Sequence, residues 1–228
     1  MKKFAAPVLV LFLSAGTLLA AGPADRPSEW AVAVAGTSVQ NLYRVEDGFY
    51  RGAQPSADGF KELVGLGVKT VIDLAGGGGD GAFVKEGSLK LVHLPMHAWS
   101  LRDDRVLEAL RVMADPSNRP IMIHCQHGAD RTGALVALYR VVVQGWTKER
   151  AVEEMNRGGY HHNSLFSNLD RYVRRADVDA LRKALGVKAP DPAAPAPIVA
   201  AVSAAPAPVV AAVPAAAPAL AIVAPVTP

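Results

Sequence analysis

Cysteine is nearly absent from this sequence, because Cys125 is the only one among 228 residues. A chain with a single cysteine forms no internal disulfide. A lone thiol is a chemical liability in an oxidising compartment, so its presence indicates either burial or a chemical role.

Strong charge of one sign is also missing. The formal net charge is +3, with no run of basic residues and no interleaving of basic and aromatic side chains. Nucleic acid is therefore a poor candidate for the partner of this protein.

Charged residues are scarce at both ends of the chain. The first 24 residues carry only Lys2 and Lys3, and residues 189–228 carry only Asp191. Between these ends, about 25% of the residues are charged, which is usual for a soluble domain. The composition excludes full-length disorder, a coiled coil and a multi-span membrane protein.

Residues 1–21 have the pattern of a secretory signal peptide. Two lysines precede an apolar stretch over 4–19, and small residues follow it. We expect cleavage and export to a bacterial periplasm or beyond, with no stable membrane insertion afterwards. An uncleaved segment would instead act as an N-terminal membrane anchor.

Residues 189–228 form a distinct tail, in which 34 of 40 residues are Ala, Pro or Val. Ten prolines interrupt any helix that could start there. The composition predicts a disordered spacer.

The middle of the chain, residues 30–188, reads as a single α/β domain. Short apolar strands alternate with helical patterns, which predicts a mostly parallel central sheet flanked by helices. A hairpin is expected to turn at Asp47-Gly48. Further strands are expected at 68–74, 89–94 and 121–123, and helices at 57–66, 104–114, 131–144, 148–157, 164–175 and 177–185.

The most informative stretch is residues 123–133, Ile-His-Cys-Gln-His-Gly-Ala-Asp-Arg-Thr-Gly. It joins a buried strand to a helix, and open α/β sheets bind ligands at that end of a strand. A helix N-terminus favours the thiolate of Cys125, and its free N–H groups can hold a tetrahedral oxyanion.

Three further residues of this stretch suit phosphate chemistry. The planar guanidinium of Arg131 can hold two phosphate oxygens at once. The Thr132 hydroxyl can donate a hydrogen bond to the sulfur, and Gly128 lets the backbone approach an anion. Together they describe a thiolate nucleophile that attacks phosphorus.

This arrangement, Cys, five residues, Arg and Thr with His before the Cys, resembles the active-site motif of the cysteine-based protein tyrosine phosphatases. Residues 49–55 and 155–160 are similar to segments of the atypical dual-specificity phosphatases, and the resemblance covers about residues 42–175. It implies a phosphatase fold and the hydrolysis of phosphomonoesters through a phosphocysteine. The substrate would be a phosphorylated protein or a small phosphoester, with no metal or cofactor.

The resemblance also implies roles for single residues. Cys125 would be the nucleophile and Arg131 the phosphate clamp, while His124 would orient the loop and Thr132 would assist the thiolate. The remaining loop residues would surround the substrate phosphate: Gln126, His127, Gly128, Ala129 and Asp130. For Asp130, the alternative is a helix cap.

The family protonates the leaving group with an Asp on an upstream loop. Asp103, 22 residues before Cys125, is the candidate, with Asp104 and His97 in reserve. The rival interpretation is that Asp103 caps the helix that follows it.

Other functions remain open from sequence. Inositol phosphates and phosphoinositides are alternative substrates to phosphotyrosine protein. Lipid-directed members of the family often carry basic residues where Gln126 and Ala129 stand, which argues against a highly anionic substrate. Two other classes are a non-catalytic phosphate-binding module and a rhodanese-like sulfurtransferase, which also places a cysteine before a helix.

Two smaller features invite functional interpretations and have plainer ones. The glycine run 76–79 lacks a following helix, so we expect a mobile loop rather than a dinucleotide site. His161 and His162 lack a third ligand at suitable spacing for a metal, so we expect loop residues beside the pocket.

Overall fold

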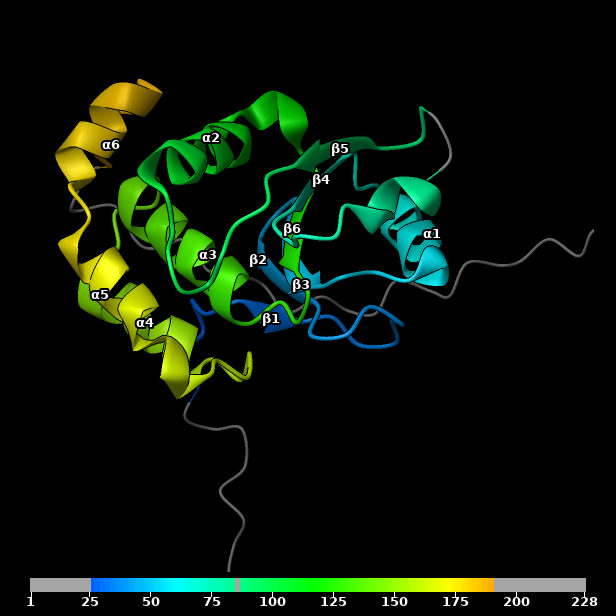
Figure 1. Cartoon of the computed structure of the whole chain (residues 1–228), viewed down its shortest axis with the longest axis horizontal. Helices are drawn as coiled ribbons and strands as arrows, with labels where there is room; N and C mark the ends of the chain where they lie inside the picture. Colours follow the sequence, from blue (N-terminus) through cyan, green and yellow to red (C-terminus); the bar gives the residue numbers. More distant parts are fainter. Residues whose placement is uncertain (1–25, 85–86, 191–228) are drawn as a thin grey trace, which may run out of the picture.

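The computed structural model describes residues 26–84 and 87–190. The predicted signal peptide, residues 1–21, and all but the first two residues of the predicted tail lie outside the described residues. The described part forms a six-stranded sheet with helices on both faces (Figure 1).

The sheet combines a parallel half with an antiparallel edge. Its strands are β1 (Val32–Ala33), β2 (Tyr43–Glu46), β3 (Phe49–Ala53), β4 (Thr70–Asp73), β5 (Lys90–His93) and β6 (Ile121–Cys125). In the order β1-β2-β3-β6-β4-β5, the pairs β3–β6, β6–β4 and β4–β5 are parallel and the other two are antiparallel. The predicted α/β class with a mostly parallel sheet centre is confirmed.

The helices follow the predicted order. They are α1 (Ala57–Gly65), α2 (Asp103–Ala114), α3 (Asp130–Val142), α4 (Lys148–Arg157), α5 (Ser167–Arg175) and α6 (Val178–Leu185), with short 3₁₀ turns at Gly79–Ala82, Pro116–Asn118 and Ser164–Phe166. Figure 1 shows α1 on one side of the sheet and the other helices gathered on the opposite side.

Alternation along the central strand β6 builds a core on each face of the sheet. Ile121 and Ile123 belong to the large cluster formed with α2 to α5, whereas Met122 belongs to the smaller cluster formed with α1. Because successive strand side chains point to opposite faces, one fully buried strand serves both cores.

Local signals explain some of the helix starts. The Ser56 side chain accepts from Gly59 N at the start of α1, and Thr147 accepts from Arg150 N at the start of α4, as expected for N-caps. The predicted cap at Asp103 is wrong, because α2 already includes Asp103 and the N-cap residue Arg102 makes no side-chain cap bond.

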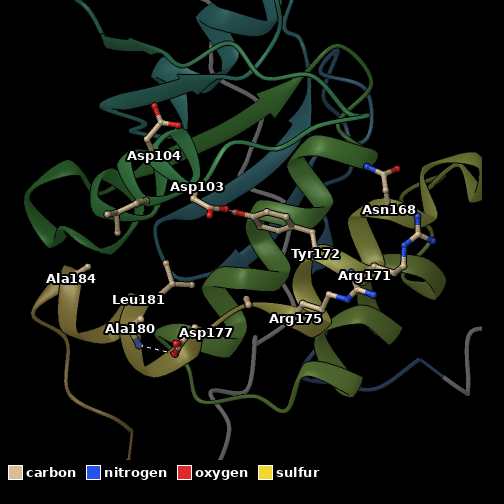
Figure 2. A pocket seen from close by; sticks show the side chains of 12 residues that line it. Asp103, Asp104, Asn168, Arg171, Tyr172, Arg175, Asp177, Ala180, Leu181 and Ala184 are labelled. Carbon is tan, nitrogen blue, oxygen red and sulfur yellow. Dashed lines mark hydrogen bonds between the residues drawn. The ribbon is translucent and has the colours of Figure 1, made fainter.

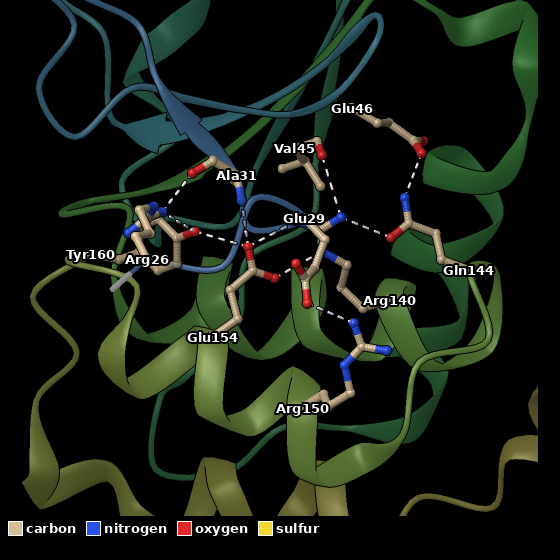
Figure 3. Close-up of polar contacts among 10 residues, drawn as sticks. All are labelled: Arg26, Glu29, Ala31, Val45, Glu46, Arg140, Gln144, Arg150, Glu154 and Tyr160. Carbon is tan, nitrogen blue, oxygen red and sulfur yellow. Dashed lines mark hydrogen bonds and ion pairs between the residues drawn. The ribbon is translucent and has the colours of Figure 1, made fainter. Parts of the chain in front are cut away.

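A buried ion pair fastens α3 to α4. Arg140 Nε and Glu154 Oε2 lie 2.8 Å apart, and Arg140 Nη2 donates to Glu154 Oε1 at 2.8 Å (Figure 3). Glu154 Oε1 also accepts from Ala31 N and from the hydroxyl of Tyr160. These contacts bring the residue before β1 and the segment after α4 together on one carboxylate.

None of the helices in the described residues combines the length and the apolar character that a membrane crossing requires.

Candidate active site

The loop between β6 and α3 follows an inner strand of the sheet, which lies between β3 and β4. Cys125 is the last residue of β6 and is 2% exposed. It pairs in register with Ala53 of β3, and its neighbour His124 pairs with Asp73 of β4 on the other side. The carboxyl end of a central parallel strand, with a neighbour on each side, is where open α/β sheets bind ligands.

The carbonyl groups of this loop are held from outside. Three donors near β3 reach three successive carbonyls: Gln54 N to Gln126 O at 3.3 Å, Asn41 Nδ2 to His127 O at 2.9 Å, and Arg51 Nη2 to Gly128 O at 2.8 Å. The backbone N–H groups of residues 126–132 make no hydrogen bond within the part of the chain described here. The loop therefore offers a set of free donors for an anion.

Gly128 is required by both its conformation and its surroundings. Its φ of +70° lies in the left-handed region, and a Cβ added there would lie 2.3 Å from the carbonyl carbon and oxygen of Gly52. A glycine is therefore needed here for the close approach of the loop to strand β3, and the expected approach to an anion stays a prediction.

The guanidinium of Arg131 is held by two backbone carbonyls through one nitrogen, while another of its nitrogens has no partner among the described residues. Its Nη1 donates to Leu74 O and to Met96 O, both at 3.2 Å. Its Nε is buried and has no hydrogen-bond partner among the described residues. An orphaned, buried and positively charged donor next to free N–H groups fits a bound oxyanion.

Thr132 is fully buried in the first turn of α3. Its hydroxyl has no hydrogen-bond partner within the described ranges, so it donates to no sulfur in this structure. Its assistance to the thiolate stays a prediction. Of the other expected loop residues, Gln126 and His127 are exposed and Ala129 is buried.

Behind the loop, His124 is held by a residue that the sequence did not single out. Its Nε2 lies 2.8 Å from Asp80 Oδ2, and its Nδ1 lies 3.3 Å from Cys125 O. Asp80 is 3% exposed and also accepts from Gln54 Nε2 at 2.9 Å. The glycine run 76–79, which we expected to form a mobile loop, is thus followed directly by Asp80, a buried residue that contacts His124.

Asp130 does not cap α3, which corrects one expectation. The N-cap residue is Ala129, and Asp130 Oδ1 instead accepts from Asn163 N at 2.9 Å and lies 3.0 Å from His162 Nδ1. Burial works to raise the pKa of Asp130, but the contacts with His162 and Asn163 outweigh it and lower the pKa. His162 therefore lies beside the loop, as expected, and in contact with it.

Asp103, the general acid expected from sequence, makes a contact outside the loop in this structure. Its Oδ1 accepts from the hydroxyl of Tyr172 at 2.6 Å (Figure 2). Both residues line a cavity of about 760 Å³ between α2, α5 and α6, and no residue of 125–131 lines it. The Asp103 carboxylate therefore faces Tyr172 of α5 in this structure, and its role as the general acid stays a prediction. Burial, with the hydrogen bond to Asp103 second, raises the pKa of Tyr172.

The two reserve acids differ in their surroundings. Asp104 is exposed and accepts two hydrogen bonds from Arg102, which lower its pKa and keep it ionised. His97 directly follows Met96, whose carbonyl contacts the Arg131 guanidinium. Of the three acids expected from sequence, His97 belongs to the segment that reaches the loop.

Two buried residues that support the loop were missed as functional residues. Arg51, 1% exposed, holds Gly128 O and stacks over the Tyr160 ring at 3.7 Å from its centroid. It lies in the segment 49–55 that carries the family resemblance, so that segment was the available signal. Asp80 had no such signal, because only the folded chain shows what faces it.

Comparison with known families identifies the domain. Residues 28–170 match the family model described as "DSP-PTPase phosphatase fused to NAD+ Kinase". The match includes the whole segment from β1 to the middle of α5.

Individual relatives agree with this family. The chain is 43% identical over 182 residues to the dual specificity protein phosphatase TpbA of Pseudomonas aeruginosa, covering 79% of this chain and 82% of TpbA. A crystal structure of P. aeruginosa TpbA in complex with pTyr superposes with a TM-score of 0.64 at 40% identity, covering 71% of this chain and 98% of that one. The inositol diphosphatase DSP3 of Arabidopsis thaliana is 31% identical, covering 64% of this chain and 74% of DSP3.

Proposed function

The chain belongs to the dual-specificity protein tyrosine phosphatase family of cysteine-dependent phosphatases, and from that premise we propose that Cys125 hydrolyses phosphotyrosine in proteins through a phosphocysteine intermediate. One observation carries the proposal. Cys125 ends a buried strand, and neither the N–H groups of the loop that follows nor Arg131 Nε has a hydrogen-bond partner among the described residues.

The first step of the reaction transfers the phosphoryl group to sulfur. The Cys125 thiolate attacks phosphorus, an S–P bond forms, and the P–O bond to the leaving oxygen breaks. That oxygen leaves with the electron pair and takes a proton from a general acid. The loop N–H groups and Arg131 Nε hold the three phosphoryl oxygens while negative charge develops on them.

The second step returns the enzyme to its starting state. Water attacks the phosphorus of the phosphocysteine and loses a proton to the group that acted as acid. The S–P bond breaks, which releases inorganic phosphate and the Cys125 thiolate. The atoms and charges balance without a metal ion or an electron carrier.

We assign the leaving-group proton to His97, because Met96 and Arg131 bring its segment to the loop. An acid matters in proportion to the basicity of the leaving oxygen, and tyrosine is a poorer leaving group than an activated phenol. We expect His97→Asn to slow hydrolysis of a phosphotyrosine peptide about tenfold or more, and an activated aryl phosphate far less.

Asp103→Asn is the matched control for this experiment. It removes the acid expected from sequence, which contacts Tyr172 instead. Greater discrimination between the two leaving groups by Asp103→Asn than by His97→Asn would contradict the assignment.

The surface around the loop favours a protein substrate. Trp99 and Leu165 are 66% and 70% exposed, and the Trp99 ring packs on Phe166 at 4.6 Å between centroids. Their two segments contact the first turn of α3, since Met96 O accepts from Arg131 and Asn163 N donates to Asp130. An aromatic and aliphatic rim can contact a phosphotyrosine ring and the peptide that carries it.

An inositol phosphate is the second candidate substrate, because one relative is named as an inositol diphosphatase. A multiply phosphorylated ring needs several cations, and Gln126 and Ala129 supply none. We expect kcat/KM for a phosphotyrosine peptide to exceed that for inositol polyphosphates and phosphoinositides by more than about tenfold. The reverse order would assign the enzyme to the inositol phosphates.

We further propose that the enzyme acts outside the cytoplasm, because residues 1–21 have the pattern of a cleaved secretory signal. Expression of the full chain followed by fractionation and N-terminal sequencing tests this. A mature N-terminus shortly after residue 21 in the periplasmic or secreted fraction is expected. An intact Met1 in the cytoplasmic fraction would contradict it.

A further inference from the structure

The side chain of Asn41 bridges the loop between β6 and α3 and the turn that follows α4. Its Nδ2 donates to His127 O at 2.9 Å and to Tyr160 O at 3.1 Å. Both acceptors are carbonyl oxygens, which only accept, so the two hydrogens of the amide nitrogen define the orientation of this side chain. One residue, which lies before β2, thus joins two segments that are 86 and 119 residues away in sequence.

The backbone of Asn41 has an uncommon conformation. Its φ is +56°, in the left-handed region that residues other than glycine seldom adopt and that asparagine tolerates better than most. His161 is the other non-glycine residue with a positive φ in the part of the chain described, and it directly follows Tyr160. Conformations of this kind persist where the surrounding structure requires them, and they gather at functional sites.

The turn at the far end of this bridge is held by several contacts. The Tyr160 hydroxyl donates to Glu154 Oε1 at 2.9 Å and accepts from Arg26 Nη2 at 3.1 Å (Figure 3). The guanidinium of Arg51 lies over the Tyr160 ring, 3.7 Å from its centroid, and Tyr160 is 1% exposed. The bridge therefore connects the loop to a buried and closely packed part of the domain.

The hydrogen bond to His127 O also orients the next N–H group of the loop. His127 O and Gly128 N belong to one trans peptide unit, in which the C=O and the N–H point in opposite directions. Because Asn41 holds the oxygen, the Gly128 N–H points away from Asn41. This N–H has no hydrogen-bond partner among the described residues, so it is available to a phosphoryl oxygen.

Asn41 is the one uncharged side chain among the three donors that hold successive carbonyls of the loop. The other two are the backbone N–H of Gln54 and the guanidinium of Arg51. A substitution does not remove the backbone donor, and Arg51 also packs on Tyr160. Asn41 is therefore the position at which the loss of a single donor can be measured by itself.

We propose that Asn41 is a positioning residue for phosphoryl transfer, which acts by turning the Gly128 N–H toward the phosphoryl group. The inference rests on the proposed function and deepens it. A donor that is oriented before the substrate binds stabilises the charge of the transition state without reorganisation during the reaction. Asn41 acts through the loop backbone and not by contact with the reacting atoms.

The substitution Asn41→Gly removes the amide and leaves a residue that adopts a positive φ without strain. Vanadate bound to the Cys125 sulfur resembles the transition state, whereas inorganic phosphate resembles the ground state. We expect the dissociation constant to rise about tenfold for vanadate and less for phosphate, and kcat for an aryl phosphate to fall about tenfold with a smaller change in KM. Vanadate affinity and kcat close to those of the unsubstituted protein would overturn the proposal.

The matched control is Tyr43→Phe. The Tyr43 hydroxyl donates to Gly159 O at 3.3 Å, so this variant also removes a hydrogen bond to the turn after α4. It removes none to the loop, because the Tyr43 side chain makes no hydrogen bond there among the described residues. Vanadate affinity and kcat should stay close to the original values. A loss as large as that in Asn41→Gly would assign the effect to the turn and contradict the role of Asn41.

A measurement on the unsubstituted protein covers the case in which Asn41→Gly does not fold. In a nitrogen-15 NMR spectrum, the backbone amide signal of Gly128 should shift when inorganic phosphate is added. An unmoved Gly128 signal beside shifted signals from the rest of the loop would overturn the proposal. If the unsubstituted protein bound neither phosphate nor vanadate, the proposed function would fail as well, whereas binding that Asn41→Gly leaves unchanged removes only the role of Asn41.

Discussion

The guanidinium of Arg131 illustrates how a single residue is prepared for its ligand before that ligand arrives. Two carbonyls, Leu74 O and Met96 O, hold Nη1, while Nε stays buried and unpartnered among the described residues. The Arg131 side chain has therefore already lost its conformational entropy on folding. Phosphate binding does not have to compensate for ordering this side chain.

Arg131→Lys should therefore lower kcat by about 10²–10³-fold. Lysine keeps the charge, but it lacks the planar fork that can contact carbonyls and phosphate oxygens at the same time. Steady-state kinetics on an aryl phosphate measure the loss, and continued alkylation of Cys125 shows that the loop survives. Near-normal turnover would rule out the clamp.

At the scale of elements, α3 and α4 depend on one buried ion pair. Glu154→Gln leaves Arg140 with a neutral partner in a place without water, which costs about 3 kcal/mol. For a domain of this size, the melting temperature should drop by about 6–12 °C in a thermal unfolding scan.

The neighbouring Glu153→Gln is the control for this prediction. Its pair with Arg157 is largely exposed, at 3.3 Å, so its loss should change stability by at most about 0.5 kcal/mol. Equal melting temperatures for the two variants would contradict a stabilising role for the buried pair.

Elements with local signals were predictable from sequence, and contacts between elements were not. Asp47-Gly48 marks the β2–β3 turn, and Ser56 and Thr147 mark helix starts, because a turn or a cap depends on its nearest residues. The motif from His124 to Thr132 placed the loop correctly for the same reason.

The misplaced residues depend on distant partners. Asp103 looks like a cap or an acid until α5 brings Tyr172 to it, 69 residues away. Asp80 looks like part of a glycine loop until β6 brings His124 to it. No periodicity or spacing in the sequence encodes either approach, since each is set by how helices and strands pack.

At the scale of the whole molecule, buried carboxylates tie stability to pH. For Asp80, Asp130 and Glu154, burial works to raise the pKa, but ion pairs and hydrogen bonds outweigh it and lower the pKa. A group with a lowered folded pKa contributes stability above its unfolded pKa, and this stability is lost as the pH falls.

The melting temperature should therefore be nearly constant above about pH 5 and fall as the pH drops below about 4. Thermal scans between about pH 7 and pH 2.5 measure this. Asp80→Asn removes one of the three groups, so its curve should fall less steeply than that of the unsubstituted protein. A melting temperature that rises on acidification would contradict the account.

The position of the nucleophile also belongs to this scale. Strand β6 lies between β3 and β4. Arg51 of β3 therefore donates to Gly128 O in the loop, and the Leu74 carbonyl after β4 accepts from Arg131 in the first turn of α3. Both contacts depend on the pairing of β6 with β3 and with β4, so the geometry of the site depends on the folded sheet.

The central claim is that Cys125 attacks phosphorus, and its most direct test is the turnover of Cys125→Ser. Serine keeps the loop and its N–H groups but does not ionise near neutral pH. The account predicts that kcat on a phosphotyrosine peptide falls by several orders of magnitude, while vanadate or phosphate still binds with nearly the original affinity. Turnover by Cys125→Ser close to that of the unsubstituted enzyme would contradict it.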